Sequence, residues 1–169
     1  PSAVLMLLFE EEKKWSFFLM ERSNDVEYHR GQISLPGGAQ EKGEGLEGTA
    51  LREANEEIGI VPASVHMLGE ITPLFIPASG FRVHPFVGWS ETVPKVTIDS
   101  NEVAALHKVK VENLLDDSRM KQEQREIRGF NVNVPYFHLN QLKVWGATAA
   151  ILSECKDIFS KCYSMENTL

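Results

Sequence analysis

The chain has 169 residues, of which 43% are hydrophobic and 24% are charged, close to the averages for soluble globular proteins. Its net charge of -7 argues against a broad nucleic-acid-binding face or an anionic membrane surface as partner. The two cysteines are too few for a disulfide framework, and the apolar opening of seven residues is too short to span a membrane. We therefore expect one domain over residues 1–169, cytoplasmic and with reduced thiols, and we leave open a targeting segment before Pro1.

The first half of the chain predicts a hairpin followed by a helix. The apolar runs Ala3–Phe9 and Trp15–Met20 flank a charged turn, which is typical of two antiparallel strands. Residues 21–36 are polar and irregular, and they end in "SLPGG". Apolar residues then recur every four positions from Leu46 to Ile58, which predicts an amphipathic helix that ends at Gly59.

The second half predicts strands and helices in mixed order. Proline and glycine separate three candidate strands, a short helix follows, and "RGFN" marks the turn of a second hairpin before a last helix. These expected elements are strands within 64–71, 72–77 and 81–89, a helix within 111–117, a hairpin over 125–139 and a helix over 145–162. In the last helix, Cys155 and Cys162 are seven residues apart, and we expect both to be buried.

The end of the first helix carries an unusual excess of negative charge. Glu53, Glu56 and Glu57 lie three and four residues apart, on a face opposite the apolar row, where the helix dipole makes carboxylates unfavourable. A solvated acidic face is one interpretation. The other is a cation site, because Mg²⁺ prefers oxygen ligands and the "PGG" turn just upstream offers bare backbone carbonyls. Such a site is typical of chemistry on phosphoanhydrides.

The spacing Gly38, five residues, Glu44, seven residues, then "REANEEIGI" resembles the signature of Nudix hydrolases. Ala54 is smaller than the aliphatic residue usual at its position. The resemblance implies an α/β/α sandwich with a central mixed β-sheet, and a divalent ion, Mg²⁺ or Mn²⁺. It also implies roles for individual residues. Glu53, Glu56 and Glu57 would be metal ligands or the base, Arg52 would orient them, Gly37 and Gly38 would supply a carbonyl, Glu44 would support or bind the metal, and Glu102 is the candidate for a further glutamate.

The segment "FLMERSNDVEYHRGQISLPGG" is similar to the pattern that precedes this signature in the coenzyme A diphosphatases of the Nudix superfamily. The segment "KVWGATAAI" resembles their strand-to-helix junction. The resemblance suggests these substrate-binding residues: Arg22, Ser23, His29, Arg30 and Gly31. Three positions depart from the pattern, namely Met20, Leu35 and Glu27. Glu27 replaces an arginine and would repel the 3′-phosphate of coenzyme A, although Arg22 and Arg30 could compensate.

The preferred prediction is metal-dependent cleavage of coenzyme A, or an acyl derivative, into 3′,5′-ADP and 4′-phosphopantetheine. The first alternative is the same chemistry on ADP-ribose, NADH or a nucleoside triphosphate. An alternative of another class is a non-catalytic Nudix domain that senses a nucleotide or binds a protein, and a third is an acidic structural protein. The expected partner is a small molecule, with no nucleic acid and no membrane, and a homodimer is left open.

Overall fold

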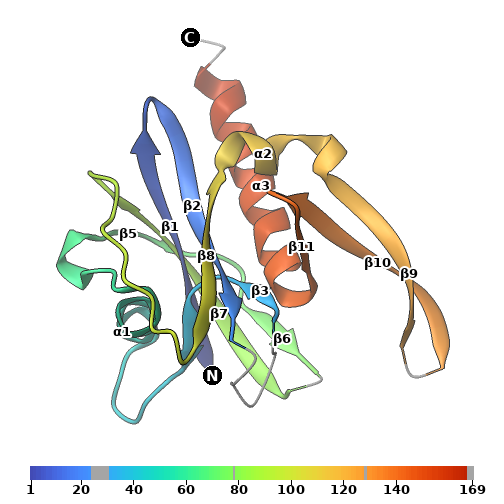
Figure 1. The fold of residues 1–169 in the computed structure, drawn as a ribbon, viewed down its shortest axis with the longest axis horizontal. Helices are drawn as coiled ribbons and strands as arrows, with labels where there is room; N and C mark the ends of the chain where they lie inside the picture. The colour runs from blue at the N-terminus through green and yellow to red at the C-terminus, as the bar shows by residue number, and fades with distance from the viewer. Residues whose placement is uncertain (24–30, 78, 128, 167–169) are drawn as a thin grey trace.

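The computed structural model describes residues 1–23, 31–77, 79–127 and 129–166. Eight strands form one mixed sheet, and three form a small antiparallel sheet (Figure 1). Within the described ranges, none of the helices is both long enough and apolar enough to cross a membrane. The elements in chain order are β1 (Ser2–Glu11), β2 (Lys14–Arg22), β3 (Ile33–Ser34), β4 (Gly37–Ala39), α1 (Leu46–Ile58), η1 (Pro62–Ser64), β5 (His66–Glu70), β6 (Leu74–Ile76), β7 (Phe81–Ser90), β8 (Val103–Lys110), α2 (Val111–Leu115), η2 (Asp117–Arg119), β9 (Met120–Ile127), β10 (Phe130–Leu139), β11 (Leu142–Trp145) and α3 (Gly146–Glu166).

Strand β1 is the centre of the large sheet. The main path runs β3-β2-β1-β7-β5, and β4, β8 and β6 pair with β1, β2 and β7 respectively. β1 is parallel to β7 and antiparallel to β2 and β4, which makes the sheet mixed. A strand with neighbours on its edges and helices on both faces is buried all round, which explains why Ala3–Phe9 is a continuous apolar run.

The sheet lies between helix α1 on one face and helix α3 on the other (Figure 1). Alternate residues of β1 serve the two interfaces, since successive side chains of a strand point to opposite faces. Leu5, Leu7 and Phe9 pack with α1, whereas Met6 and Leu8 pack with the layer that contains α3. The predicted α/β/α sandwich with a central mixed sheet is therefore confirmed.

Helix α1 has the predicted bounds, and Gly59 ends it. Gly59 has φ 74°, in the left-handed region that glycine adopts without penalty. Its N–H donates to Asn55 O at 2.9 Å, and Ile60 N–H donates to Ala54 O at 3.2 Å. A Cβ atom at this position would lie 3.0 Å from the backbone nitrogen of Thr97. Both the backbone conformation and the close neighbour therefore require glycine here.

Several other predictions are confirmed, and some are wrong. The first hairpin is β1 and β2, the three candidate strands are β5, β6 and β7, the short helix is α2, and the second hairpin is β9 and β10. Strand β8 was not predicted. The last helix begins at Gly146 rather than Trp145, which is the final residue of β11, and it continues to Glu166. Cys155 is buried as expected, whereas Cys162 is exposed.

Candidate active site on helix α1

Strand β4 lies directly against the acidic side of α1, and two glycines allow this approach. Gly37 and Gly38 pair with Val4 and Ala3 of β1. A Cβ atom on Gly38 would lie 2.5 Å from the carboxylate carbon of Glu53, and one on Gly37 would lie 2.3 Å from the carbonyl oxygen of Ala3. A side chain at Gly37 would therefore meet rigid backbone, and one at Gly38 would displace the Glu53 carboxylate. The absence of a Cβ atom at these two positions lets a carboxylate of α1 reach the backbone of β4.

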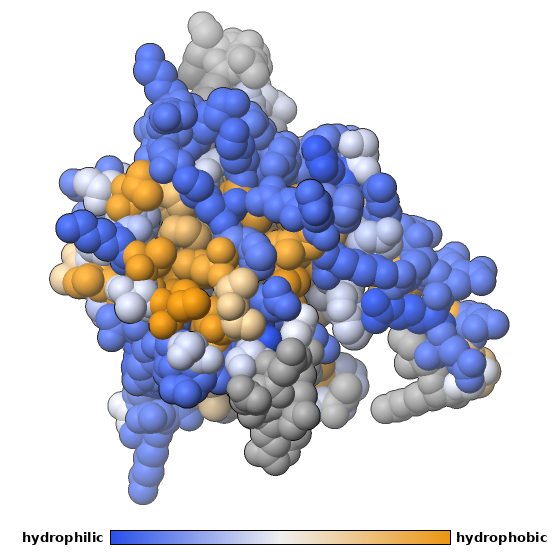
Figure 2. All heavy atoms as spheres, viewed as in Figure 1, coloured by the Kyte–Doolittle hydropathy of each residue, from blue (hydrophilic) through white to orange (hydrophobic). Residues whose placement is uncertain are grey.

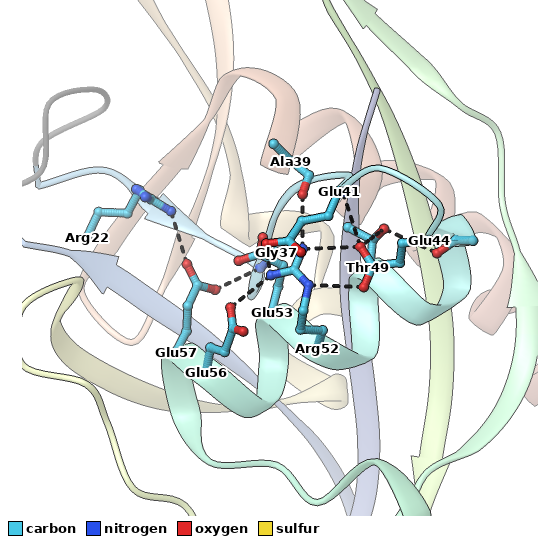
Figure 3. A network of polar contacts seen from close by, with 11 residues as sticks. Arg22, Gly37, Ala39, Glu41, Glu44, Thr49, Arg52, Glu53, Glu56 and Glu57 are labelled. Atoms are coloured by element: carbon cyan, nitrogen blue, oxygen red, sulfur yellow. Dashed lines mark hydrogen bonds and ion pairs between the residues drawn. The ribbon is translucent and has the colours of Figure 1, made fainter.

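The guanidinium of Arg52 lies among carboxylates (Figure 3). Its Nε donates to Glu44 Oε1 at 3.0 Å, and its Nη2 donates to the carbonyl oxygen of Ala39 at 3.0 Å. Its Nη1 lies 2.8 Å from Glu56 Oε2 and 3.0 Å from Glu53 Oε1. The hydrogen bond to Glu44 and the neighbouring negative charges raise the pKa of Arg52 above its ordinary value. Arg52 therefore connects the loop before α1 to β4 and orients three carboxylates.

Glu44 is held at the beginning of α1 by its own set of donors. Thr49 Oγ1 donates to Glu44 Oε2 at 2.7 Å, and the Glu41 backbone N–H donates to the same oxygen at 3.3 Å. Hydrogen bonds from Arg52 and then from Thr49 lower the pKa of Glu44 to about 2. These contacts favour the supporting role among the two predicted for Glu44. Sequence reasoning missed Thr49, although a fully buried hydroxyl beside Ala50 needs a partner.

Glu57 is the most buried carboxylate of the helix, with 1% of its side chain exposed. Its Oε2 accepts a hydrogen bond of 2.8 Å from the Gly37 N–H, and its Oε1 lies 3.3 Å from Arg22 Nη1. Burial raises the pKa of Glu57 to about 8; Gly37 and Arg22 oppose the rise, and the negative charges of Glu53 and Glu102 add to it. The spacing placed Glu57 on the face opposite the apolar row, but its side chain is buried under β4 and the end of β2.

Glu53 and Glu56 differ in side-chain exposure, although they share a face of α1. The Glu53 side chain is 14% exposed, and that of Glu56 is 56% exposed. Burial raises the pKa of Glu53, Arg52 opposes the rise, and the charges of Glu56 and Glu102 contribute to it. Glu53 and Glu57 are therefore two carboxylates whose burial outweighs the effect of the arginine beside each of them.

Glu102, predicted as a further glutamate of the site, lies close enough to raise the pKa of both buried carboxylates. Backbone hydrogen bonds bring it there. Asp99 N–H donates to Glu57 O at 2.9 Å, and Ser23 N–H donates to Glu102 O at 2.8 Å. The loop that carries Glu102 is thus fastened both to the last turn of α1 and to the end of β2. Glu102 itself is exposed, so it faces the solvent side of the cluster.

A divalent cation fits the chemistry of this cluster. Within the described ranges, no group of three or more His, Cys, Asp or Glu side chains already has the geometry of a metal site. The donor set nevertheless consists of carboxylates, which Mg²⁺ and Mn²⁺ prefer. Burial and the neighbouring carboxylates raise the pKa values of Glu53 and Glu57, and a bound cation would favour the charged form of both. The Gly38 position lies against Glu53, as the predicted backbone ligand requires.

A cavity of about 340 Å³ adjoins the cluster. Arg22 and Gly37 line it near Glu57, and Trp145 lines it together with the first residues of α3. The Nε atom of Arg22 is buried and has no hydrogen-bond partner among the described residues. The remaining wall is mostly apolar, with the polar residues Gln32 and Ser34 beside the apolar residues Val4, Ile33, Leu35, Ile76, Val83 and Ile151. The cavity therefore joins a charged end to an apolar body, an arrangement typical of small-molecule sites.

A larger cavity of about 460 Å³ lies towards the other end of β1, and we do not assign the reaction to it. Leu8, Trp15, Trp89 and Tyr163 are among the residues that line it. In the part of the chain that the structure describes, neither cavity is lined by a carboxylate, but Arg22 and Gly37 of the smaller cavity both donate to Glu57. Chemistry on a diphosphate needs cations and their ligands, and the smaller cavity is connected to such ligands in this way. The smaller cavity, which lies against the start of α3 and reaches the acidic cluster through Arg22 and Gly37, is therefore the candidate active site.

The predicted substrate-binding residues are described only in part. Arg22 lies in the site, and Ser23 is buried immediately after it. The Gly31 N–H donates to Arg22 O at 3.0 Å, and Gly31 is exposed with φ 63°. The predictions for His29 and Arg30, and the question raised by Glu27, fall outside the described residues.

The family model described as "NUDIX domain" matches residues 1–128 of the chain. "Nudix hydrolase 15, mitochondrial" of Arabidopsis thaliana is 35% identical over 89% of the chain, and "Uncharacterized Nudix hydrolase NudL" of Pectobacterium atrosepticum is 35% identical over 82%. The chain spans 55% of the plant protein and 72% of the bacterial one. The crystal structure of the Nudix hydrolase RenU from M. smegmatis has a TM-score of 0.67 at 15% identity, over 95% of this chain and 85% of that one. The fold, the arrangement of the box residues on α1 and these likenesses together show that the chain belongs to the Nudix hydrolase family.

Proposed function

We propose that the chain hydrolyses the diphosphate bond of a nucleoside diphosphate derivative in the presence of Mg²⁺ or Mn²⁺, with coenzyme A or an acyl derivative as the preferred substrate. The observation that carries this proposal is the pair of carboxylates, buried Glu57 and partly buried Glu53, near a cavity lined by Arg22. The resemblance of residues 18–38 and 143–151 to coenzyme A diphosphatases supports the choice of substrate. A single domain, acting in the cytoplasm, belongs to the same proposal.

The acidic residues would hold the divalent ion. We assign this role to Glu53, Glu56 and Glu57, with the backbone of Gly38 and the side chain of Glu102 as further candidates. When bound, such an ion draws negative charge from the diphosphate oxygens and favours ionisation of water. The predicted choice between ligand and base for each glutamate stays open, because all of these carboxylates lie within one electrostatically coupled cluster.

The other residues of the site have separate tasks. Arg22 lines the cavity next to Glu57 and would contact a phosphate oxygen, since a guanidinium offers paired donors to phosphate. Arg52 keeps the carboxylates oriented, and Glu44 keeps Arg52 in place. Ser23, His29, Arg30 and Gly31 are the remaining proposed substrate contacts.

The reaction needs no covalent intermediate with the protein. Water attacks one phosphorus, and a carboxylate of the cluster accepts its proton. The bond from that phosphorus to the bridging oxygen breaks, and its electron pair leaves with the second phosphate. Coenzyme A would yield 3′,5′-ADP and 4′-phosphopantetheine. ADP-ribose, NADH or a nucleoside triphosphate would undergo the same cleavage if Glu27 repels the 3′-phosphate of coenzyme A.

The test is incubation of the chain with coenzyme A, acetyl-coenzyme A, NADH, ADP-ribose and nucleoside triphosphates, each with Mg²⁺ or Mn²⁺, and identification of the products by mass. We expect coenzyme A to be cleaved fastest, and both Glu53→Gln and Glu57→Gln to lose turnover by on the order of 100-fold or more. Glu47→Gln is the matched control, because Glu47 lies in the first turn of α1, outside the cluster.

Three results would overturn parts of this proposal. Faster cleavage of ADP-ribose or NADH than of coenzyme A would refute the substrate and leave the reaction class intact. Saturable binding of a nucleotide with no turnover would favour the non-catalytic, sensing alternative. Turnover that is equal in Glu53→Gln, Glu57→Gln and Glu47→Gln would refute the assignment of the site.

A further inference from the structure

The β9–β10 hairpin projects from the body of the molecule (Figure 1). Strand β11 pairs with β10 only from Tyr136 to Leu139, so the rest of the hairpin is two-stranded. The surface seen in Figure 2 is mostly hydrophilic over this hairpin, while apolar side chains gather over the body. An isolated two-stranded ribbon is only marginally stable, so the contacts at its base determine how firmly it is held.

The base of the hairpin holds two aromatic rings under two cations. Directly opposite residues of an antiparallel pair share a face, and the register places Tyr136 opposite Trp145. The Arg125 guanidinium lies 4.1 Å from the centre of the Trp145 ring, and Lys143 Nζ lies 4.7 Å from the centre of the Tyr136 ring. Glu123 joins the two cations, since it forms ion pairs with both Arg125 and Lys143.

This network restricts the orientation of Trp145. A guanidinium over an indole face is attracted by the ring quadrupole and stacks on it as a plane. The ion pair with Glu123 fixes the guanidinium in turn, and hydrogen bonds from Lys143 and then Arg125 lower the pKa of Glu123, so the carboxylate remains charged. These contacts therefore restrict the orientation of the indole ring from the hairpin side without any ligand.

Trp145 also forms part of the wall of the smaller cavity, the candidate active site. It is the last residue of β11, and Gly146, with φ 66°, turns the chain directly into α3. The same cavity is lined by Arg22, next to the carboxylate cluster. The cavity therefore has a cation that can bind phosphate and an aromatic residue that can contact a planar group. Its volume lies at the lower end of the range for small-molecule sites, about 300–1,000 Å³.

We propose that Trp145 is a specificity-determining residue whose indole ring stacks on the nucleobase of the substrate, and that Arg125, from the projecting hairpin, is its positioning residue. This inference rests on the proposed function, because it takes the smaller cavity to be the substrate site. It gives the hairpin a role at the site, although none of the glutamates of the acidic cluster lies on the hairpin.

Fluorescence can follow Trp145 alone. The chain has three tryptophans, and the other two, Trp15 and Trp89, line the separate, larger cavity. A Trp15→Phe/Trp89→Phe variant keeps Trp145 as the only indole. We expect adenosine 5′-monophosphate, with Mg²⁺ present, to quench its emission saturably, and 4′-phosphopantetheine to leave that emission unchanged. The opposite pattern, or calorimetric binding of the nucleotide without quenching, would overturn the proposal.

Affinity and turnover provide a second measurement. Base–aromatic stacking is worth enough that Trp145→Leu should weaken nucleotide binding and raise KM by roughly 5- to 100-fold, with kcat within about twofold of the native value. Trp145→Phe retains a ring and should stay within about threefold. Arg125→Leu should raise KM less than Trp145→Leu does, and Arg125→Lys should recover part of that loss, because a cation remains over the ring.

The controls separate failure of this inference from failure of the proposed function. Trp89→Phe should leave KM unchanged, since Trp89 stacks on His66 away from the site. Quenching by adenosine 5′-monophosphate without cleavage of any diphosphate would refute the reaction and retain the role of Trp145. Cleavage with an unchanged KM in Trp145→Leu would refute the role of Trp145 and retain the reaction. Absence of calorimetric binding of the nucleotide would overturn the inference.

Discussion

Replacing Glu57 by glutamine should remove a large part of the pH dependence of folding in the metal-free protein. The buried carboxyl has a pKa of about 8 in the folded chain, compared with an ordinary value of 4.5. Between these two values the folded chain retains a proton that the unfolded chain releases, so the free energy of unfolding falls as pH rises. One proton changes this free energy by up to about 1.4 kcal/mol per pH unit, which amounts to about 4 kcal/mol between pH 5 and pH 8.

The measurement is urea unfolding at pH 5, 6, 7 and 8 with a chelator present, for the native chain, Glu57→Gln and the control Glu47→Gln. The native chain and Glu57→Gln differ in one titrating group, so the difference between their profiles isolates Glu57, and Glu47→Gln shows the effect of removing an exposed glutamate from the same helix. We expect the native chain and Glu47→Gln to lose about 4 kcal/mol more than Glu57→Gln over this range. Parallel profiles for the native chain and Glu57→Gln would refute a buried proton at this position.

The remaining predictions concern the backbone and the supporting carboxylates. Gly38→Ala should change the free energy of unfolding by less than about 1 kcal/mol and lower kcat/KM by on the order of 100-fold, because the new Cβ meets only the movable end of Glu53; urea unfolding and steady-state kinetics test both. Gly37→Ala should cost about 3 kcal/mol or more, because its Cβ meets the carbonyl of Ala3 in β1; an unfolding midpoint equal to that of Gly38→Ala would contradict this. Glu44→Gln should lower kcat/KM roughly tenfold by releasing Arg52, with Glu47→Gln unchanged in the same assay. Mn²⁺, added during urea unfolding at pH 8, should stabilise the native chain more than Glu57→Gln, and equal stabilisation would contradict Glu57 as a ligand.

Local sequence patterns predict the strands and helices that are specified by residues within the segment itself. The apolar runs of β1 and β2 flank a short charged turn, and helix α1 has both an apolar row of period four and a glycine stop. Strand β8 has no such signal. It is an edge element with mixed burial, and it is a strand because it pairs with β2, which lies about 85 residues earlier in the chain. That pairing is a tertiary effect, which a local pattern cannot predict.

The acidic residues of the site could be predicted from spacing, but their separate environments could not. Positions 53, 56 and 57 share one side of an ideal helix, yet Glu57 is buried and Glu56 is mostly exposed. The difference comes from β4, whose two glycines approach α1 at the position of Glu57 and Glu53. Likewise, Trp145 was expected to begin the last helix. It ends β11 instead, lines the cavity and contacts Arg125 of β9, a tertiary contact that a local pattern cannot predict.

The hydrogen bond from the Gly37 amide to Glu57 makes that amide a reporter of motion. Its proton is held between strand β4 and the last turn of α1, so exchange with solvent deuterium requires the two elements to separate. β4 is itself paired with the central strand β1, and the neighbouring Leu5 amide donates to Pro36 O at 2.9 Å. The ratio of exchange rates at Gly37 and Leu5 thus distinguishes opening of the helix alone from opening of the sheet, and a cation bound by the helix should slow the first without slowing the second.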